Sequence, residues 1–169
     1  MGLFNGTVLV TPTVFLLDVD GVMTDGKFYY TTEGKVMKAF GPDDHEALAL
    51  LDSYLHIHFV TGDFRGLEIS KARIVTDMNR PLDLVSTKDR IDWIRQQWDP
   101  TQVIYMGDGL YDHRVFEHVL YGIAPANADR FTQSKANFVT QSAGGNRAVA
   151  EASLHILTTF FAQSYPHGV

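Results

Sequence analysis

The chain has 169 residues, about the length of one domain, and its 45% hydrophobic and 12% aromatic content indicates a buried core rather than disorder. There are 20 Asp and Glu residues against 14 Lys and Arg, and the formal net charge of -6 has the wrong sign for a protein that binds nucleic acid through its phosphates. Cysteine is absent, which excludes disulfides, thiolate nucleophiles and thiolate zinc sites and favours a cytoplasmic location.

The first 40 residues predict one strand and one hairpin. Residues 1–13 show no signal-peptide pattern, and no apolar run in the chain is long enough to cross a bilayer, so we expect no membrane partner. Residues 14–17 form a short apolar run, typical of a strand buried on both faces, that ends at the carboxylates of Asp18 and Asp20. In residues 28–40, aromatic and β-branched runs flank a glycine-containing turn, which predicts a β-hairpin that projects from the core.

Beyond the hairpin, predicted strands alternate with predicted helices. The strands are short apolar runs at residues 57–60, 82–85, 103–106, 121–124 and 138–139. The helices follow apolar spacings of three and four, at residues 44–55, 67–76, 86–98, 111–118 and 146–161. This alternation predicts an α/β fold of the Rossmann-like type, with a mostly parallel central sheet between two layers of helices, in one domain over residues 1–169.

Polar side chains follow three of the predicted strands and form a candidate site. They are Asp18 and Asp20 after the first strand, Thr61 and Gly62 after the second, and Asp108 and Asp112 after the strand at 103–106. In parallel sheets, ligands bind beyond the carboxyl ends of the strands. We therefore expect these residues to share one crevice.

The carboxylates of this site predict a bound divalent cation. Asp18, Asp20 and Asp108 would repel one another unless a cation lay among them, and hard oxygen ligands favour Mg²⁺ over zinc. The cation would keep Asp18 ionised and screen an approaching phosphate dianion.

Three further groups are candidates for holding the phosphoryl oxygens. They are the hydroxyl of Thr61, the amide of Gly62 and the ammonium of Lys88, which lies where a helix is predicted to begin. With a carboxylate nucleophile, this set predicts phosphoryl transfer through an aspartyl-phosphate.

Four motifs in order resemble those of the haloacid dehalogenase superfamily of phosphohydrolases. The motifs are Asp18-Val19-Asp20-Gly21-Val22, Thr61-Gly62, Lys88, and Gly107-Asp108-Gly109-Leu110-Tyr111-Asp112. The resemblance implies that Asp18 is the nucleophile and that Asp20 is the general acid/base, whose backbone carbonyl also binds Mg²⁺. It further implies phosphoryl binding by Thr61 and Lys88. The resemblance also implies that Asp108 is a magnesium ligand and that Asp112 supports the metal site without binding the ion directly.

A narrower resemblance is to the 3-deoxy-D-manno-octulosonate 8-phosphate phosphatases and the related acylneuraminate-9-phosphate phosphatases. It rests on residues 18–26, on the hairpin that leads into Lys38-Ala39-Phe40, and on Ala143-Gly144-Gly145. It implies a small sugar or sugar-acid phosphate as substrate and a core without a cap domain. It also implies a homotetramer in which neighbouring subunits cover each site, and we expect the hairpin at 28–40 to take this part.

The chain departs from this subfamily where the subfamily tends to have basic residues. The positions are Asp63, Asn146, Ala150 and Asp43. Fewer cations weaken the recognition of a carboxylate on the substrate. Arg65 and Arg147 are candidate replacements, and Asp44 is either a substrate contact or a helix cap.

Two other functions remain open. A site without a cap also admits a macromolecular phosphate, such as a nucleic-acid end or a phosphoprotein, although the acidic composition argues against it. A catalytically silent assembly module is the other alternative, and the complete set of motif residues argues against that one. Taken singly, each motif residue also has an ordinary structural role, such as a polar turn or a helix-terminal acid.

Overall fold

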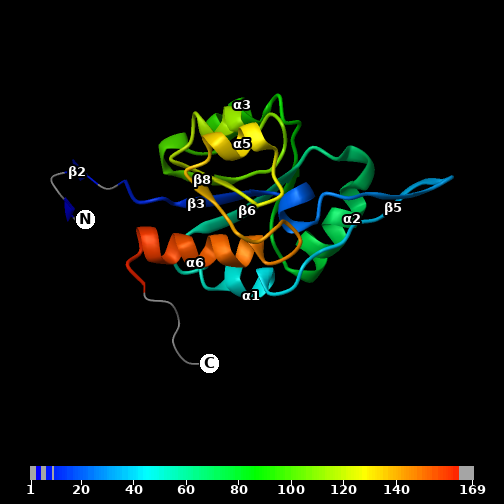
Figure 1. Ribbon diagram of the computed structural model, residues 1–169, viewed down its shortest axis with the longest axis horizontal. Coiled ribbons are helices and arrows are strands. Elements are labelled where there is room, and N and C mark those ends of the chain that lie inside the picture. Colours follow the sequence, from blue (N-terminus) through cyan, green and yellow to red (C-terminus); the bar gives the residue numbers. More distant parts are fainter. Residues whose placement is uncertain (1–2, 5–6, 9, 164–169) are drawn as a thin grey trace.

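A computed structural model of the protein describes residues 3–4, 7–8 and 10–163, with side chains from residue 10 onward. Its centre is a six-stranded sheet in the order β10-β9-β8-β3-β6-β7, and every neighbouring pair is parallel (Figure 1). The strands are β3 (Val14–Asp18), β6 (His56–Thr61), β7 (Leu82–Leu84), β8 (Val103–Met106), β9 (Tyr121–Ala124) and β10 (Phe138–Val139). The predicted Rossmann-like fold is thereby confirmed.

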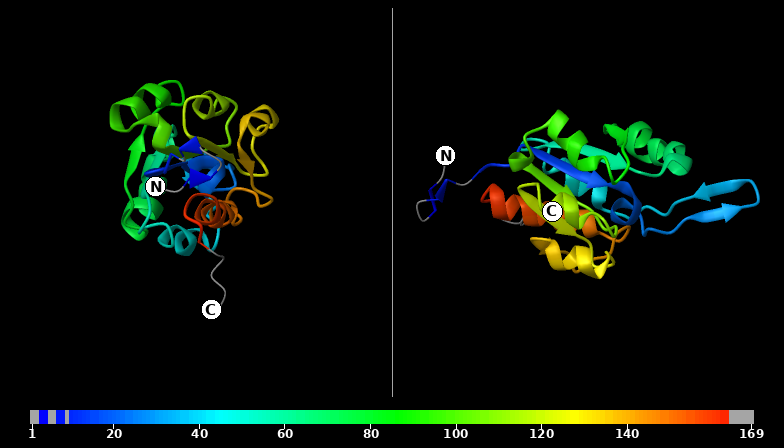
Figure 2. Two further views of the ribbon diagram at one scale, coloured as in Figure 1. Left: turned by 90° about the vertical axis from the view of Figure 1, so that its left-hand side faces the viewer. Right: turned by 90° about the horizontal axis from the view of Figure 1, so that it is seen from above.

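Helices cover both faces of this sheet (Figures 1 and 2). One face packs against α1 (Asp44–Ala49), α6 (Ala148–Phe160) and the helical segment that follows α2 (Leu67–Lys71). The other face packs against α3 (Arg90–Gln97), α4 (His113–Phe116) and α5 (Arg130–Lys135).

The central strand β3 supplies both halves of the core. Phe15 and Leu17 belong to the cluster on the α1 and α6 face, whereas Val14 and Leu16 belong to the cluster on the α3 face. Successive strand side chains point to opposite faces, so a strand between two helical layers must be apolar throughout. This is why the predicted run at 14–17 has no polar positions.

Some helices differ from the prediction. Helix α1 ends at Ala49, and turns occupy the rest of the stretch predicted as helix to residue 55. Helix α5 was not predicted. Its start has a clear local signal, because the Asp129 carboxylate accepts hydrogen bonds from the backbone N–H groups of Phe131 and Thr132.

Strands β4 (Tyr29–Thr31) and β5 (Gly34–Met37) form the predicted antiparallel hairpin, which projects beyond the body of the molecule (Figures 1 and 2). Tyr30 and Met37 are more than half exposed on it. Among residues 10–163 this hairpin is the largest insertion, and no separate cap domain accompanies the sheet. A short antiparallel pair, β1 (Leu3–Phe4) and β2 (Thr7–Val8), lies outside the central sheet. Within the described ranges no helix is long and apolar enough to cross a bilayer.

Candidate active site

The predicted site residues meet at the carboxyl end of the central strands. Asp18 is the last residue of β3, Thr61 is the last residue of β6, and Asp108 lies two residues beyond β8. Because β3 lies between β6 and β8 in the sheet, Asp18 occupies the middle of this edge. A cavity of about 350 Å³ opens there, and it is lined by Asp18, Asp20, Phe28, Gly62, Asp63, Ser86, Thr87 and Arg90.

A tight loop, Val19–Met23, follows Asp18 and lies against Asp108. Asp18 Oδ1 accepts a hydrogen bond of 2.9 Å from the N–H of Val19. Gly21 has a φ of +88°, and a Cβ there would lie 1.9 Å from Oδ2 of Asp108. Only glycine allows both this backbone conformation and the close approach of Asp108 to the loop.

The Ala143-Gly144-Gly145 segment supports this loop from behind. A Cβ on Gly144 would lie 1.8 Å from the carbonyl oxygen of Gly21, so the two backbones are in direct contact. The N–H of Gly145 donates a hydrogen bond of 3.1 Å to the carbonyl of Val22. These glycines therefore position the catalytic loop rather than line the cavity.

Asp18, Asp108 and Asp112 form a group that fits a divalent cation. Each offers one carboxylate oxygen, and these oxygens all lie within 4.8 Å of one another. Burial, followed by repulsion from Asp18 and Asp112, raises the pKa of Asp108 to about 8. Burial likewise raises the pKa of Asp18, against the opposing effect of Arg90. Carboxylates held this close in a buried site favour a hard cation such as Mg²⁺ among them.

Asp112 is held by hydrogen bonds, as a supporting residue should be. Its Oδ1 accepts a bond of 2.8 Å from the Tyr105 hydroxyl, and its Oδ2 accepts one of 2.8 Å from the N–H of Gly109. These two bonds fix the orientation of the Asp112 carboxylate beside Asp18 and Asp108.

The Asp20 side chain turns away from this group. Its Oδ2 accepts a hydrogen bond of 2.9 Å from the Thr61 hydroxyl, and its Oδ1 lies 2.7 Å from the ammonium of Lys38. The Asp20 side chain is therefore outside the group of Asp18, Asp108 and Asp112, and metal binding by its backbone carbonyl stays a prediction. The Thr61 hydroxyl also accepts a bond of 3.1 Å from the N–H of Asp63, so Thr61 links the Asp20 carboxylate to the loop after β6.

Lys38 is a site residue that the sequence prediction missed. Its side chain is fully buried, and its ammonium lies 2.9 Å from Asp63 Oδ2 and 2.8 Å from the Ser70 hydroxyl, besides Asp20. Lys35 of the hairpin also pairs with Asp63. Burial alone would raise the pKa of Asp63, but hydrogen bonds from the two lysines outweigh it and lower that pKa.

Arg90, and not the predicted Lys88, is the cation that contacts Asp18. Lys88 is exposed and lines a different cavity. Arg90 is fully buried and lines the catalytic cavity, with its Nη1 3.1 Å from Asp18 Oδ2 and 2.6 Å from the Tyr105 hydroxyl. Its Nη2 donates a hydrogen bond of 3.1 Å to the carbonyl of Val85. The acidic neighbours Asp18 and Asp112 raise the pKa of Arg90 against its desolvation, so it stays charged.

The three candidate substrate contacts lie outside the catalytic cavity. Arg65 is exposed and does not line it. Arg147 pairs with Asp43, with 2.6 Å between Arg147 Nε and Asp43 Oδ2. Asp44 is 1% exposed, and its Oδ1 accepts a hydrogen bond of 3.0 Å from the N–H of Ala150 in the first turn of α6. This hydrogen bond joins Asp44, in α1, to the first turn of α6.

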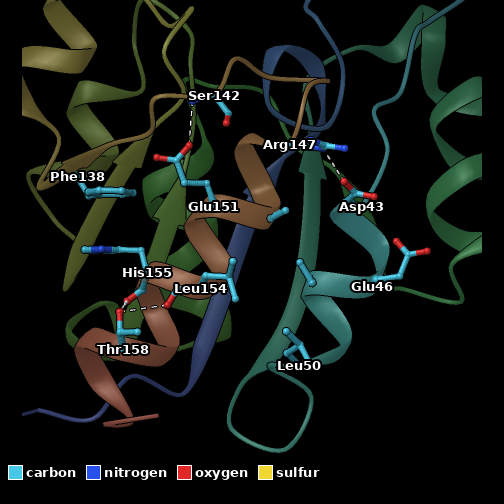
Figure 3. Close-up of a pocket in the computed structure, with 12 residues that line it drawn as sticks. Asp43, Glu46, Leu50, Phe138, Ser142, Arg147, Glu151, Leu154, His155 and Thr158 are labelled. Atoms are coloured by element: carbon cyan, nitrogen blue, oxygen red, sulfur yellow. Dashed lines mark hydrogen bonds and ion pairs between the residues drawn. The ribbon is translucent and has the colours of Figure 1, made fainter. Parts of the chain in front are cut away.

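The largest cavity described, of about 900 Å³, lies between α1 and α6 and not at the carboxylates. Figure 3 shows Arg147 turned toward Asp43 at one end of it and His155 beside Phe138 at the other. None of the residues that line it belongs to the acidic cluster. The smaller cavity, which Asp18 lines, is therefore the candidate active site.

Replacing Asp44 by asparagine should stabilise the protein at neutral pH. Burial raises the pKa of Asp44 to about 6, so the folded state keeps this proton more tightly than the unfolded chain does. Stability consequently falls as the pH rises from about 4 to 6. The variant Asp44→Asn has no such proton to lose. Its free energy of unfolding should exceed that of the natural protein by about 2–3 kcal/mol at pH 7 and by almost nothing at pH 4.

Urea unfolding at both pH values measures this difference. The exposed Asp92, which pairs with Arg95, supplies the control Asp92→Asn, for which we expect a change below about 0.5 kcal/mol at either pH. A gain for Asp44→Asn that does not depend on pH would contradict the explanation.

The chain is similar to known phosphatases. Residues 93–152 match the haloacid dehalogenase-like hydrolase family. The 3-deoxy-D-manno-octulosonate 8-phosphate phosphatase of Escherichia coli K12 is 31% identical over 150 residues, which cover 82% of this chain and 75% of that protein.

Solved structures of such phosphatases share the fold. The enzyme from Yersinia pestis superposes with a TM-score of 0.73 at 30% identity, over 88% of this chain and 82% of that one. The enzyme from Moraxella catarrhalis, solved with a magnesium ion, a phosphate ion and KDO, gives a TM-score of 0.74 at 25% identity, over 89% and 90% of the two chains. The chain thus belongs to the haloacid dehalogenase-like phosphatases that include the 3-deoxy-D-manno-octulosonate 8-phosphate phosphatases, and Mg²⁺ is its cofactor.

Proposed function

We propose that the protein hydrolyses the phosphate monoester of a small sugar or sugar acid, with Asp18 as the nucleophile. The observation that carries this proposal is the arrangement around Asp18, which lies beside a buried arginine and within a carboxylate group that fits Mg²⁺. The charges also support it. Asp18, Asp20, Asp63, Asp108 and Asp112 face three buried cations, Lys35, Lys38 and Arg90, and the difference of two negative charges equals one divalent cation.

In the first step, a carboxylate oxygen of Asp18 attacks phosphorus, and the bond from phosphorus to the ester oxygen breaks. Asp20 gives its proton to the departing oxygen, so that the sugar leaves as an alcohol. The Thr61 hydroxyl and the Lys38 ammonium fix the orientation of Asp20 for this transfer. Mg²⁺, held by Asp18, Asp108 and the Asp20 carbonyl, would screen the repulsion between the phosphate and the carboxylates.

In the second step, Asp20 takes a proton from water, and the water oxygen attacks phosphorus. The bond to Asp18 then breaks, which regenerates its carboxylate and releases inorganic phosphate. Arg90 balances the charge that returns to Asp18. Gly62, Ser86 and Thr87 line the cavity where phosphoryl oxygens would lie.

Phosphate release from a panel of esters tests this function. Sugar phosphates should be hydrolysed with Mg²⁺, and removal of the metal by a chelator should lower the rate at least about a hundredfold, with recovery on adding Mg²⁺ back. Hydrolysis of only phosphopeptides or nucleic-acid ends would favour the macromolecular alternative. No hydrolysis of any ester would favour the silent module.

We further propose that the protein assembles as a homotetramer in which the hairpin of one subunit covers the site of the next. The support is the exposure of Tyr29, Tyr30, Val36 and Met37 on a hairpin that extends past the body of the molecule (Figure 2). Light scattering after size exclusion should give four times the chain mass. A monomer with full activity would contradict the proposal.

A further inference from the structure

A second cavity, of about 320 Å³, adjoins the catalytic one. It is lined by Thr87, Lys88, Ile91, Tyr111 and Arg114. Thr87 also lines the catalytic cavity, so the two are neighbours along the start of α3. The lining of the second cavity includes two basic residues and no acid, whereas three acids line the catalytic cavity. The lining of the second cavity is thus more basic than that of the catalytic cavity.

The two basic side chains of this cavity form no ion pair with a carboxylate of the described residues. Nine of the 14 basic residues form an ion pair with a carboxylate in the described part of the chain, and Lys88 and Arg114 do not. The guanidinium carbon of Arg114 lies 5.1 Å from the centroid of the Tyr111 ring, which restricts its position. In a protein of net charge -6, two unpaired cations at one cavity favour an anionic ligand.

The two buried lysines near Asp63 are neutralised by carboxylates. Asp63 lines the catalytic cavity, and the cations beside it, Lys35 and Lys38, are both paired with its carboxylate. The Lys35 ammonium also lies 3.4 Å from the centroid of the Phe28 ring. These two lysines are therefore already paired, whereas Lys88 and Arg114 form no ion pair within the residues that the structure describes.

We propose that Lys88 and Arg114 form a subsite for a second anionic group, a carboxylate or a phosphate, of the ester whose phosphoryl group is transferred to Asp18. This proposal rests on the proposed phosphatase function and adds the direction in which the substrate lies. The substrate would extend from Asp18 past Thr87 toward Lys88 and Arg114, away from Asp63. Lys88 then serves the distal end of the substrate rather than the reacting phosphate.

Paired substrates test this subsite in the Mg²⁺-loaded protein. Glucose 6-phosphate carries one anionic group, 6-phosphogluconate adds a carboxylate, and fructose 1,6-bisphosphate adds a phosphate. The ratio of kcat/KM for each of the last two to that for glucose 6-phosphate is the readout. In the double variant Lys88→Met, Arg114→Gln this ratio should fall about tenfold for at least one of them, because charge-assisted hydrogen bonds to that group are lost.

Arg130→Gln is the matched control. Arg130 is also without a carboxylate partner in the described residues but belongs to α5, outside both cavities. Its removal changes the net charge without touching the proposed subsite, so the ratios should stay within twofold. Equal losses for all three esters in the double variant, or equal ratios in both variants, would overturn the subsite.

A binding measurement separates this proposal from the proposed function. Calorimetry with Asp18→Asn and the same three compounds reports affinity without turnover. If the natural protein hydrolyses none of the esters, the phosphatase proposal fails. The subsite still predicts that 6-phosphogluconate and fructose 1,6-bisphosphate, which carry a second anionic group, bind more weakly once Lys88 and Arg114 are replaced. Binding that the double substitution leaves unchanged contradicts the subsite in either case.

Discussion

Asp18→Asn should abolish phosphatase activity and leave the fold intact. The amide cannot attack phosphorus, and loss of a nucleophile that acts with its partners lowers kcat by about 10⁴-fold or more. Stability should not fall with activity. The ionised Asp18 is disfavoured by burial and by its acidic neighbours Asp112 and Asp20, and the asparagine oxygen can still accept the bond from the N–H of Val19. In metal-free buffer the melting temperature should equal or exceed that of the natural protein.

Asp20→Asn is the informative companion. Loss of a general acid/base lowers the rate by about 10²–10⁴-fold, so Asp20→Asn should keep more activity than Asp18→Asn. Steady-state phosphate release and thermal melting with and without Mg²⁺ measure both effects. If Asp18→Asn turned over esters at a tenth of the natural rate, Asp18 would not be the nucleophile.

Most of this arrangement was predictable from strand ends. Apolar runs that stop at Asp18 and Thr61, and a third that stops at Gly107-Asp108, must bring those residues to one edge of a parallel sheet. The prediction works because strand order follows from alternation with helices, and the polar residues lie where each strand has to end. Because a polar residue marks where each strand ends, the observed bounds of the strands agree with the predicted bounds better than those of the helices do.

The cations of the site were harder to predict, because they depend on helix register. The Ser86 to Asp89 stretch does form a local turn in which the Asp89 N–H bonds to Ser86, but α3 begins only at Arg90. Lys88 lies in this turn, before the helix, whereas Arg90 is the first residue of the helix, and the two line different cavities. The usable signal was that Arg90 precedes the buried Ile94 by four residues and so shares its face.

Lys38 gave no comparable signal. It follows an exposed strand of the hairpin, and only the packing of the hairpin base against the loop after β6 buries it between Asp20 and Asp63. Contacts of this kind depend on how the hairpin leaves the sheet, which local sequence does not specify. The sequence left open whether Asp44 is a helix cap, and the helix that it contacts was not predictable for the same physical reason, since its partner, Ala150, is 106 residues away.

Arg90→Met should cost both stability and activity. The substitution leaves Asp18 and Asp112 buried without their cation and removes hydrogen bonds to Tyr105 and to the Val85 carbonyl. Removing one partner of a buried ion pair costs about 3–5 kcal/mol, and the raised pKa of Asp18 allows it to take up a proton, which favours the lower figure. Urea unfolding at pH 7.5 should show a loss of about 3 kcal/mol. Activity should fall at least about a hundredfold, because the charge beside the nucleophile is no longer balanced.

Arg90→Lys distinguishes the charge from the geometry of the guanidinium. A lysine keeps a positive charge near Asp18 but cannot contact Asp18, Tyr105 and the Val85 carbonyl together, because its ammonium lacks the planar fork of arginine. It should recover more than half of the lost stability, and it should restore activity to within about tenfold of the natural protein if charge is what Asp18 requires. Arg95→Met, on the exposed side of the same helix, is the control and should cost less than about 1 kcal/mol. If Arg90→Met matched Arg95→Met in stability and kept its activity, Arg90 would have no part in the site, and the cation for Asp18 would have to come from elsewhere.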